Sequence, residues 1–129
     1  MNESAPSDCP FCHLPSERVV AANERALAVA DAFPVTAGHT LVIPKRHVGC
    51  FFDLDLSEVE AVFQLLRVTR EWLEQMHHPS GFNVGVNIGF AAGQTIMHAH
   101  VHLIPRYSGD VPEPAGGVRN VIPGKGRYR

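Results

Sequence analysis

Short runs in which apolar and polar residues alternate predict several β-strands along this chain. The first two runs flank the turn-forming pair Asn23-Glu24, which predicts a hairpin, and Pro44 closes the third. A Gly/Ala-rich turn lies between the last two runs, so these are also expected to pair. The strands predicted from this alternation are residues 19–22, 26–30, 40–43, 82–88 and 97–104.

Between the third and fourth runs the apolar spacing becomes that of an amphipathic helix, residues 57–77. Ser57 and Glu60 have the spacing of a capping box, and Pro79 follows the expected end. About five mostly antiparallel strands with one main helix packed on them predict an α+β domain. The apolar face is expected to consist of Val59, Val62, Phe63, Leu66, Leu73 and Met76.

The chain divides into three segments by composition. Residues 1–8 are polar and are expected to be disordered, and residues 9–107 hold every predicted strand and helix. Residues 108–129 form a Gly/Pro-rich tail with a basic end. Either this tail is a flexible extension, or it lies over a neighbouring subunit and contacts the substrate.

The overall composition narrows the class of protein. With 129 residues, 45% of them hydrophobic and 19% charged, the chain is expected to form one globular domain. A formal net charge of −2 gives no basic surface for a nucleic-acid polymer. No run is long enough for a membrane span, and the beginning does not resemble a signal peptide. A cytoplasmic location is therefore expected, which also disfavours a structural disulfide.

Residues 98–102 read His-Ala-His-Val-His and carry the most informative chemistry of the chain. In an extended strand alternate side chains share a face, so His98, His100 and His102 are expected on one side and the residues between them in the core. A buried imidazole needs a polar partner, so keeping three of them for packing would be costly. The histidines are therefore predicted to be functional rather than part of a merely polar surface.

The spacing limits what these histidines can do. Alternate strand residues are about 6.6–6.8 Å apart, so His98 and His102 would lie roughly 13 Å apart, too far to share one metal ion in a straight strand. A nucleophile flanked by two supporting histidines fits better, because neutral imidazole is a good nucleophile toward phosphorus. The preceding turn brings Asn87, Gln94 and Thr95 close by, and their neutral donors suit phosphate oxygens.

The segment Gly93–Ile104, which reads Gly-Gln-Thr-Ile-Met-His-Ala-His-Val-His-Leu-Ile, resembles the signature of the histidine triad (HIT) family. The approach Gly-Gln-Thr is similar to that of the Fhit-like and Hint-like branches. A second run, from Asp31 to His47, resembles the other hallmark strand of the family. The resemblance covers about residues 9–107 and implies a HIT-like fold for this segment.

The resemblance also implies an enzyme that hydrolyses or transfers nucleotides at the α-phosphate. His100 would attack phosphorus and form a covalent nucleotidyl-imidazole, with a backbone carbonyl expected to fix its tautomer. His102 would contact the phosphate or assist the leaving group. Gln94 and Thr95 match residues that bind phosphate or leaving-group oxygens, and they join the two histidines in the expected catalytic set.

Two further residues are implied as substrate contacts. Asn87 matches an asparagine on the phosphate side, and Asp31 matches an acidic residue that holds the ribose hydroxyls in some members. A purely structural place in a turn is the alternative for each, because Asn87 precedes Gly89 and Asp31 precedes Ala-Phe-Pro.

Cys9 and Cys12 form a Cys-x2-Cys pair near the beginning of the chain. Such a pair is compatible with a redox site, a disulfide or half of a metal site. The chain also resembles bacterial HIT proteins that bind structural Zn²⁺ through two cysteines and two histidines, although His13 is a competing ligand. The expected ligands are Cys9, Cys12, His47 and His98.

The expected substrate is a small nucleotide: a dinucleoside polyphosphate, a nucleoside phosphoramidate or another adenylated compound. A phosphorylase that uses inorganic phosphate as the acceptor and a non-catalytic nucleotide-binding protein are the alternatives. HIT proteins are commonly dimeric, so a homodimer is expected, formed through the helix or the strand edge beside it.

Overall fold

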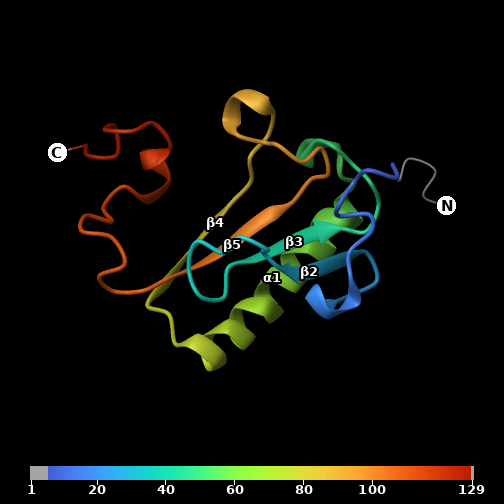
Figure 1. Ribbon diagram of the computed structural model, residues 1–129, viewed down its shortest axis with the longest axis horizontal. Helices are drawn as coiled ribbons and strands as arrows, with labels where there is room; N and C mark the ends of the chain where they lie inside the picture. The colour runs from blue at the N-terminus through green and yellow to red at the C-terminus, as the bar shows by residue number, and fades with distance from the viewer. Residues whose placement is uncertain (1–5, 129) are drawn as a thin grey trace.

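Five antiparallel strands form one sheet in the order β1-β2-β3-β5-β4, and one long helix crosses one of its faces (Figure 1). This computed structural model describes residues 6–128. It confirms the predicted α+β fold with a five-stranded sheet and one main helix. The elements are 3₁₀ helix η1 (Ser16–Arg18), β1 (Val19–Ala22), β2 (Ala26–Ala30), β3 (Thr40–Pro44), η2 (Phe51–Asp53), α1 (Leu56–His77), β4 (Gly81–Gly85), η3 (Phe90–Ala92), β5 (Val101–Arg106) and η4 (Gly117–Val121).

Strands β1 to β3 lie where the alternation predicts them. The fourth strand ends at Gly85 rather than at residue 88, and the last strand is also shorter than expected. It begins at Val101 rather than at residue 97, and its pairing with β4 ends at the register Gly85↔His102. Before it, the Ala99 N–H donates to the Val48 carbonyl at 2.6 Å, which draws this segment out of the sheet ladder. The prediction that three histidines share one face of a straight strand is therefore wrong, because only His102 lies in the strand.

Helix α1 begins one residue earlier than predicted and is capped differently. The side chain of Asp55 accepts from the Glu58 N–H, and Glu58 accepts in return from the Asp55 N–H, so the capping box is Asp55/Glu58 and not Ser57/Glu60. Ser57 lies inside the helix and donates to Asp55 at 2.6 Å. The helix ends at His77, and the capping residue His78 has a left-handed backbone conformation.

The buried face of the helix also differs from the expected one. Phe63 and Met76 are 59% and 57% exposed, although the apolar spacing places them in the predicted stripe. The helix carries apolar residues on two sides, and only the packed structure shows which side meets the sheet. The residues that face it, at intervals of three or four, are Glu58, Val62, Leu65, Thr69 and Leu73.

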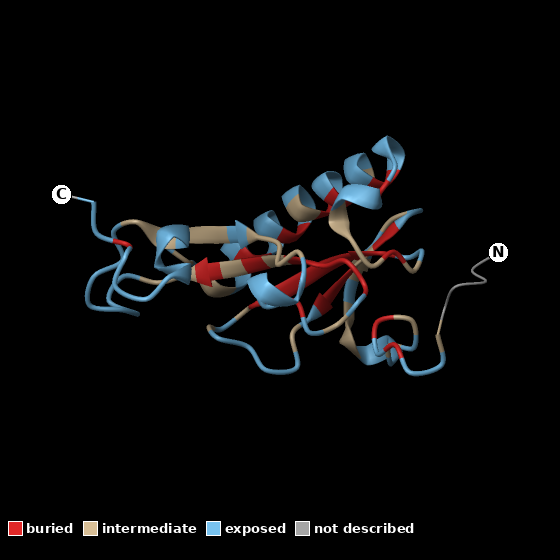
Figure 2. Cartoon of the chain, turned by 90° about the horizontal axis from the view of Figure 1, so that it is seen from above, coloured by how far each residue is buried: buried red, intermediate tan, exposed pale blue. Residues whose placement is uncertain are grey.

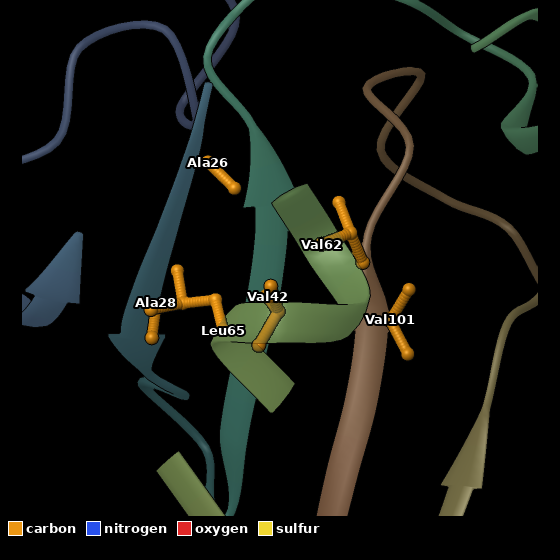
Figure 3. Close-up of a cluster of buried hydrophobic side chains, with 6 residues drawn as sticks. All are labelled: Ala26, Ala28, Val42, Val62, Leu65 and Val101. Atoms are coloured by element: carbon orange, nitrogen blue, oxygen red, sulfur yellow. The ribbon is translucent and has the colours of Figure 1, made fainter. Parts of the chain in front are cut away.

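The core has one layer on each side of the sheet. On the helix side, small strand residues lie against Val62 and Leu65, as Figure 3 shows, and the buried side of the helix is turned toward the sheet in Figure 2. On the other side, the N-terminal segment packs its Phe11 over Leu41 and Ile43. Phe11 in this second layer contacts the rings of His98 and His100, so burial of the N-terminal segment and formation of the site are linked.

Two terminal segments complete the chain. Of the predicted disordered residues 1–8, residues 1–5 lie outside the described part, while the Pro6 carbonyl accepts from the Cys9 N–H at 3.1 Å. After β5 the chain forms an irregular tail at the end of the molecule away from the N-terminus (Figure 1). Within residues 6–128 no helix is both long and apolar enough to cross a membrane.

Candidate active site

A cavity of about 470 Å³ lies on the face of the sheet opposite helix α1. Its floor includes Leu41 of β3 and His102 of β5, which are register partners. The N-terminal segment, the β2–β3 loop and the loop before the triad form its walls. Of the predicted substrate and catalytic residues, those that line it are Asp31, Asn87, Thr95, His100 and His102.

His100 is held in one tautomer by the main chain. Its Nδ1–H donates to the carbonyl oxygen of His98 at 2.8 Å, so the lone pair of Nε2 remains available for attack on an electrophile. The ring is 92% buried and contacts the edge of Phe11, with a centroid distance of 5.1 Å. The expected backbone acceptor is thus the first histidine of the triad.

His102 is oriented by His39, a residue that the sequence analysis did not single out. The Val35 N–H donates to His39 Nδ1 at 3.1 Å, so His39 carries its proton on Nε2 and donates it to His102 Nδ1 at 3.0 Å. His102 therefore presents an Nε2–H. A donor of this kind suits a phosphate or leaving-group oxygen.

Burial sets the protonation of this pair. It lowers the pKa of His102, and the neighbouring His100 and His39 lower it further, while the negative charge of Asp31 acts in the opposite direction. Burial also lowers the pKa of His39, again against Asp31, whose Oδ2 lies 3.4 Å from His39 Nε2. Both imidazoles are consequently favoured in the neutral form that the hydrogen-bond chain requires.

The remaining predicted site residues fall into two groups. Asp31 lines the cavity but also closes a turn, since its Oδ1 accepts from the Phe33 N–H at 2.8 Å. Gln94 is 97% buried and does not line the cavity. Its oxygen accepts from the Gly89 N–H, and its nitrogen donates to the carbonyls of Gly49 and Ile96. In this structure Gln94 therefore shapes the loop that carries Thr95.

The four predicted metal ligands converge beside the cavity. Cys12 Sγ lies 3.3 Å from His47 Nδ1 and 3.5 Å from His98 Nδ1, and the two Nδ1 atoms are 3.2 Å apart. Sulfur and nitrogen ligands of a tetrahedral zinc ion would be separated by about 3.4–3.8 Å. The donor types and distances therefore fit such an ion.

Local hydrogen bonds prepare His98 as a ligand. Its Nε2–H donates to the Pro44 carbonyl at 2.8 Å, which leaves the Nδ1 lone pair facing the cysteines. Burial raises the pKa of the Cys12 thiol to about 11, and the hydrogen bond and charge of Cys9 add to this effect. Binding of a cation would favour the thiolates instead. His13 lies outside the cluster, with Nε2 3.0 Å from the Pro6 carbonyl oxygen.

His98 thus connects the four candidate metal ligands to the cavity. Its side chain faces the cysteines and its carbonyl orients His100. His39 was missed because its role depends on sheet register: it lies two residues before Leu41, the partner of His102. The sequence shows only that a histidine precedes an apolar strand. The alternation pattern does not say which other strand will lie beside that strand.

Comparisons with known proteins identify the family of this chain. A family model described as the HIT domain matches residues 15–109. An uncharacterized HIT-like protein of Mycoplasma genitalium is 40% identical over 111 residues, which are 83% of this chain and 79% of that protein. The solved structure of a HIT family protein from Bacillus anthracis superposes with a TM-score of 0.74 at 38% identity, covering 81% of this chain and 77% of the other.

Two relatives carry the names of enzymes. The AP-4-A phosphorylase of Mycobacterium tuberculosis is 36% identical over 116 residues, 84% of this chain and 59% of that protein. The asymmetrical bis(5′-nucleosyl)-tetraphosphatase of Schizosaccharomyces pombe is 40% identical over 86 residues, 67% of this chain and 47% of that protein. The family model matches most of the chain, including the histidine triad. This chain belongs to the HIT family.

Proposed function

We propose that this chain is a nucleotide hydrolase or transferase that acts at the α-phosphate through a covalent intermediate on His100. The main support is the hydrogen bond from His100 Nδ1–H to the His98 carbonyl, which leaves Nε2 as the ring nitrogen available to a substrate in the cavity. The named enzymes among the relatives support the same class of reaction.

In the first step His100 Nε2 attacks the α-phosphorus, a P–N bond forms and the bond from phosphorus to the leaving oxygen breaks. The Nε2–H of His102 donates to that oxygen as negative charge develops on it, and His39 holds the required tautomer. In the second step an acceptor attacks phosphorus, the P–N bond breaks and His100 is regenerated. Water as acceptor yields a nucleoside monophosphate, whereas inorganic phosphate yields a nucleoside diphosphate.

Substrate contacts follow from the cavity lining. Asp31 is proposed to accept from the ribose hydroxyls, and Asn87 and Thr95 to donate to phosphate oxygens. Phe11 and Leu41 provide apolar surface for the base. Gln94 is proposed to act indirectly, by holding the loop that positions Thr95.

We also propose that Cys9, Cys12, His47 and His98 hold a structural Zn²⁺ ion. The ion would cross-link the N-terminal segment to the segment after β3 that carries His47 and to the segment before β5 that carries His98. Its contribution is rigidity rather than chemistry, because His98 uses a side-chain atom for the ion and a main-chain atom for His100.

A homodimer is proposed through helix α1 and β4. β4 is an edge strand of the sheet, and Val84 on it is 53% exposed. Phe63 on the helix is 59% exposed beside it, and the two line one apolar groove. Sedimentation of the wild type and of Phe63→Glu tests this arrangement: a monomeric wild type would contradict it.

The function is tested by incubating the protein with diadenosine tetraphosphate and with adenosine 5′-phosphoramidate, with and without inorganic phosphate. AMP with ATP from the tetraphosphate indicates hydrolysis, and ADP that appears only with phosphate indicates a phosphorylase. The His100→Ala variant should lose turnover and keep nucleotide binding within about tenfold. His78→Asn, a change at an exposed αL position outside the site, is the matched control. An active His100→Ala variant would exclude the mechanism, and tight binding without turnover of any substrate would favour a binding protein.

A further inference from the structure

The tail after β5 encloses a second cavity of about 470 Å³ that the proposed chemistry does not use. The sheet supplies its floor through β4 and β5, and residues from the tail form the opposite wall. Two residues of the β2–β3 loop close one side. The residues on which its chemistry depends are Val35, Asn83, Ile104, Arg106, Val111 and Asn120.

This tail cavity lies beside the histidines on the same face of the sheet. Along β5, His102, Ile104 and Arg106 alternate with the buried residues of the helix side, so Ile104 is about 6.6–6.8 Å beyond His102. The β2–β3 loop borders both cavities, with Asp31 at the first and Val35 at the second. A substrate that passes His102 and continues along β5 therefore reaches the tail cavity.

The tail is folded, not loose, over this part of the sheet. Arg106 donates to Asp110 through Nε and Nη2, each at 2.8 Å, and to Asn83 Oδ1 through Nη1 at 2.6 Å. The Tyr107 hydroxyl donates to the Ala37 carbonyl at 2.6 Å, which fastens the start of the tail to the β2–β3 loop. The start of the tail, including Asp110 in the cavity wall, is consequently held in place by hydrogen bonds within the protein.

The lining favours a neutral, flat ligand rather than a phosphate chain. Asp110 is neutralised by Arg106, and Glu113 is neutralised by Arg127. Asn83 accepts from Arg106 through its oxygen, so its Nδ2–H₂ group is the donor left for a ligand. Apolar side chains of Ile104 and other lining residues provide surface for an aromatic ring. A nucleoside matches this combination of surface and hydrogen-bond donors.

We propose that the tail cavity binds the second nucleoside of a dinucleoside polyphosphate, the one that leaves with the departing phosphates. The first nucleoside would occupy the cavity at Asp31 and Phe11, and the phosphates would cross the histidines between them. This inference rests on the proposed function and narrows it: the preferred substrates carry a nucleoside at both ends, and the tail determines that preference.

The test compares substrates with two nucleosides and with one. Val111→Trp fills the tail cavity, while Val118→Trp places the same side chain on the same tail at a residue that is 67% exposed and outside the cavity lining. For Val111→Trp we expect kcat/KM for diadenosine tetraphosphate to fall about tenfold and that for adenosine 5′-phosphoramidate to change less than about twofold. Val118→Trp should leave both values unchanged.

The outcomes separate this inference from the proposed function. If the wild type cleaves neither substrate, the proposed function fails and this inference fails with it. If the wild type cleaves the tetraphosphate but Val111→Trp affects both substrates equally, or neither, only the role of the tail cavity is overturned. Circular dichroism of both Trp variants verifies that they are folded, and a selective loss for the two-nucleoside substrate supports the proposal.

Discussion

Replacing Arg46 by Met removes the cation that holds the buried carboxylate of Glu58. Glu58 is 97% buried at the start of helix α1. Its oxygens accept from Arg46 Nη2 at 2.6 Å, from Arg46 Nε at 2.9 Å and from the Asp55 N–H at 3.0 Å. Since Arg46 precedes His47, this pair ties the helix to the segment that carries a proposed metal ligand.

The geometry bounds the size of the effect. Removing one partner of a fully buried ion pair costs about 3–5 kcal/mol. The side chain of Arg46 is 50% exposed and the Asp55 N–H remains, so water partly compensates, and we expect Arg46→Met to lower the free energy of unfolding by about 2 kcal/mol. Glu58→Gln keeps one acceptor oxygen and should cost about 1–2 kcal/mol. The double variant should lose little more than Arg46→Met, because both changes break the same interaction.

Urea denaturation followed by Trp72 fluorescence measures these differences. The hydrogen bonds from Arg46 are the main cause that lowers the pKa of Glu58 below its ordinary value of 4.5. The stabilisation is therefore present above pH 4.5 and is lost as pH falls through the folded-state pKa. The wild type should lose its advantage over Arg46→Met at acidic pH. Arg70→Met, in an exposed pair with Glu74, should cost less than about 0.5 kcal/mol. A loss for Arg46→Met as small as this control, or one independent of pH, would refute the reasoning.

Three further outcomes are expected. Cys9→Ser should lower both the bound zinc, measured by elemental analysis, and the melting temperature. Cys50→Ser should retain the metal. Full zinc content in Cys9→Ser would contradict the four-ligand site. Thr69 is 99% buried, and its hydroxyl has no hydrogen-bond partner among the residues that the structure describes. Thr69→Val should therefore raise the free energy of unfolding, measured by urea denaturation, by about 1 kcal/mol. Burial lowers the pKa of His39 and His102 below 6.5, so the free energy of unfolding should keep its full value above that pH and decrease below it. A flat profile of the free energy of unfolding between pH 7 and 5 would argue against neutral imidazoles.

Much of the fold was predictable because its signals are local. Alternation predicted β1 to β3. The turn-forming residue Asn23 predicted the hairpin between the first two, and its side chain accepts from the Ala26 N–H. The helix cap was placed wrongly because Ser57 and Asp55 both suit that position, and the choice depends on which glutamate meets Arg46. The start of β5 was also wrong, since a bond from Ala99 to the distant Val48 carbonyl ends the strand pairing there.

The candidate site divides in the same way. The four proposed metal ligands were identified from residue type and resemblance, and the fold brings them together. His39 was not identified, because its contact with His102 arises from register between β3 and β5. Gln94 was assigned to the substrate, but its amide is engaged by main-chain groups of Gly89 and Ile96 in its own loop and of the distant Gly49. Contacts between strands and loops far apart in sequence leave no periodic signal.

The bond from His100 to the carbonyl of His98 has a consequence for how such a site can change over evolutionary time. A main-chain carbonyl survives every substitution at residue 98, so the acceptor that orients His100 persists after the imidazole above it is gone. The cysteines and histidines of the proposed metal site can therefore be replaced by other residues during evolution while the hydrogen bond that orients His100 is kept. The proposed nucleophile depends on the path of the chain, and the proposed metal site would be one way of fixing that path.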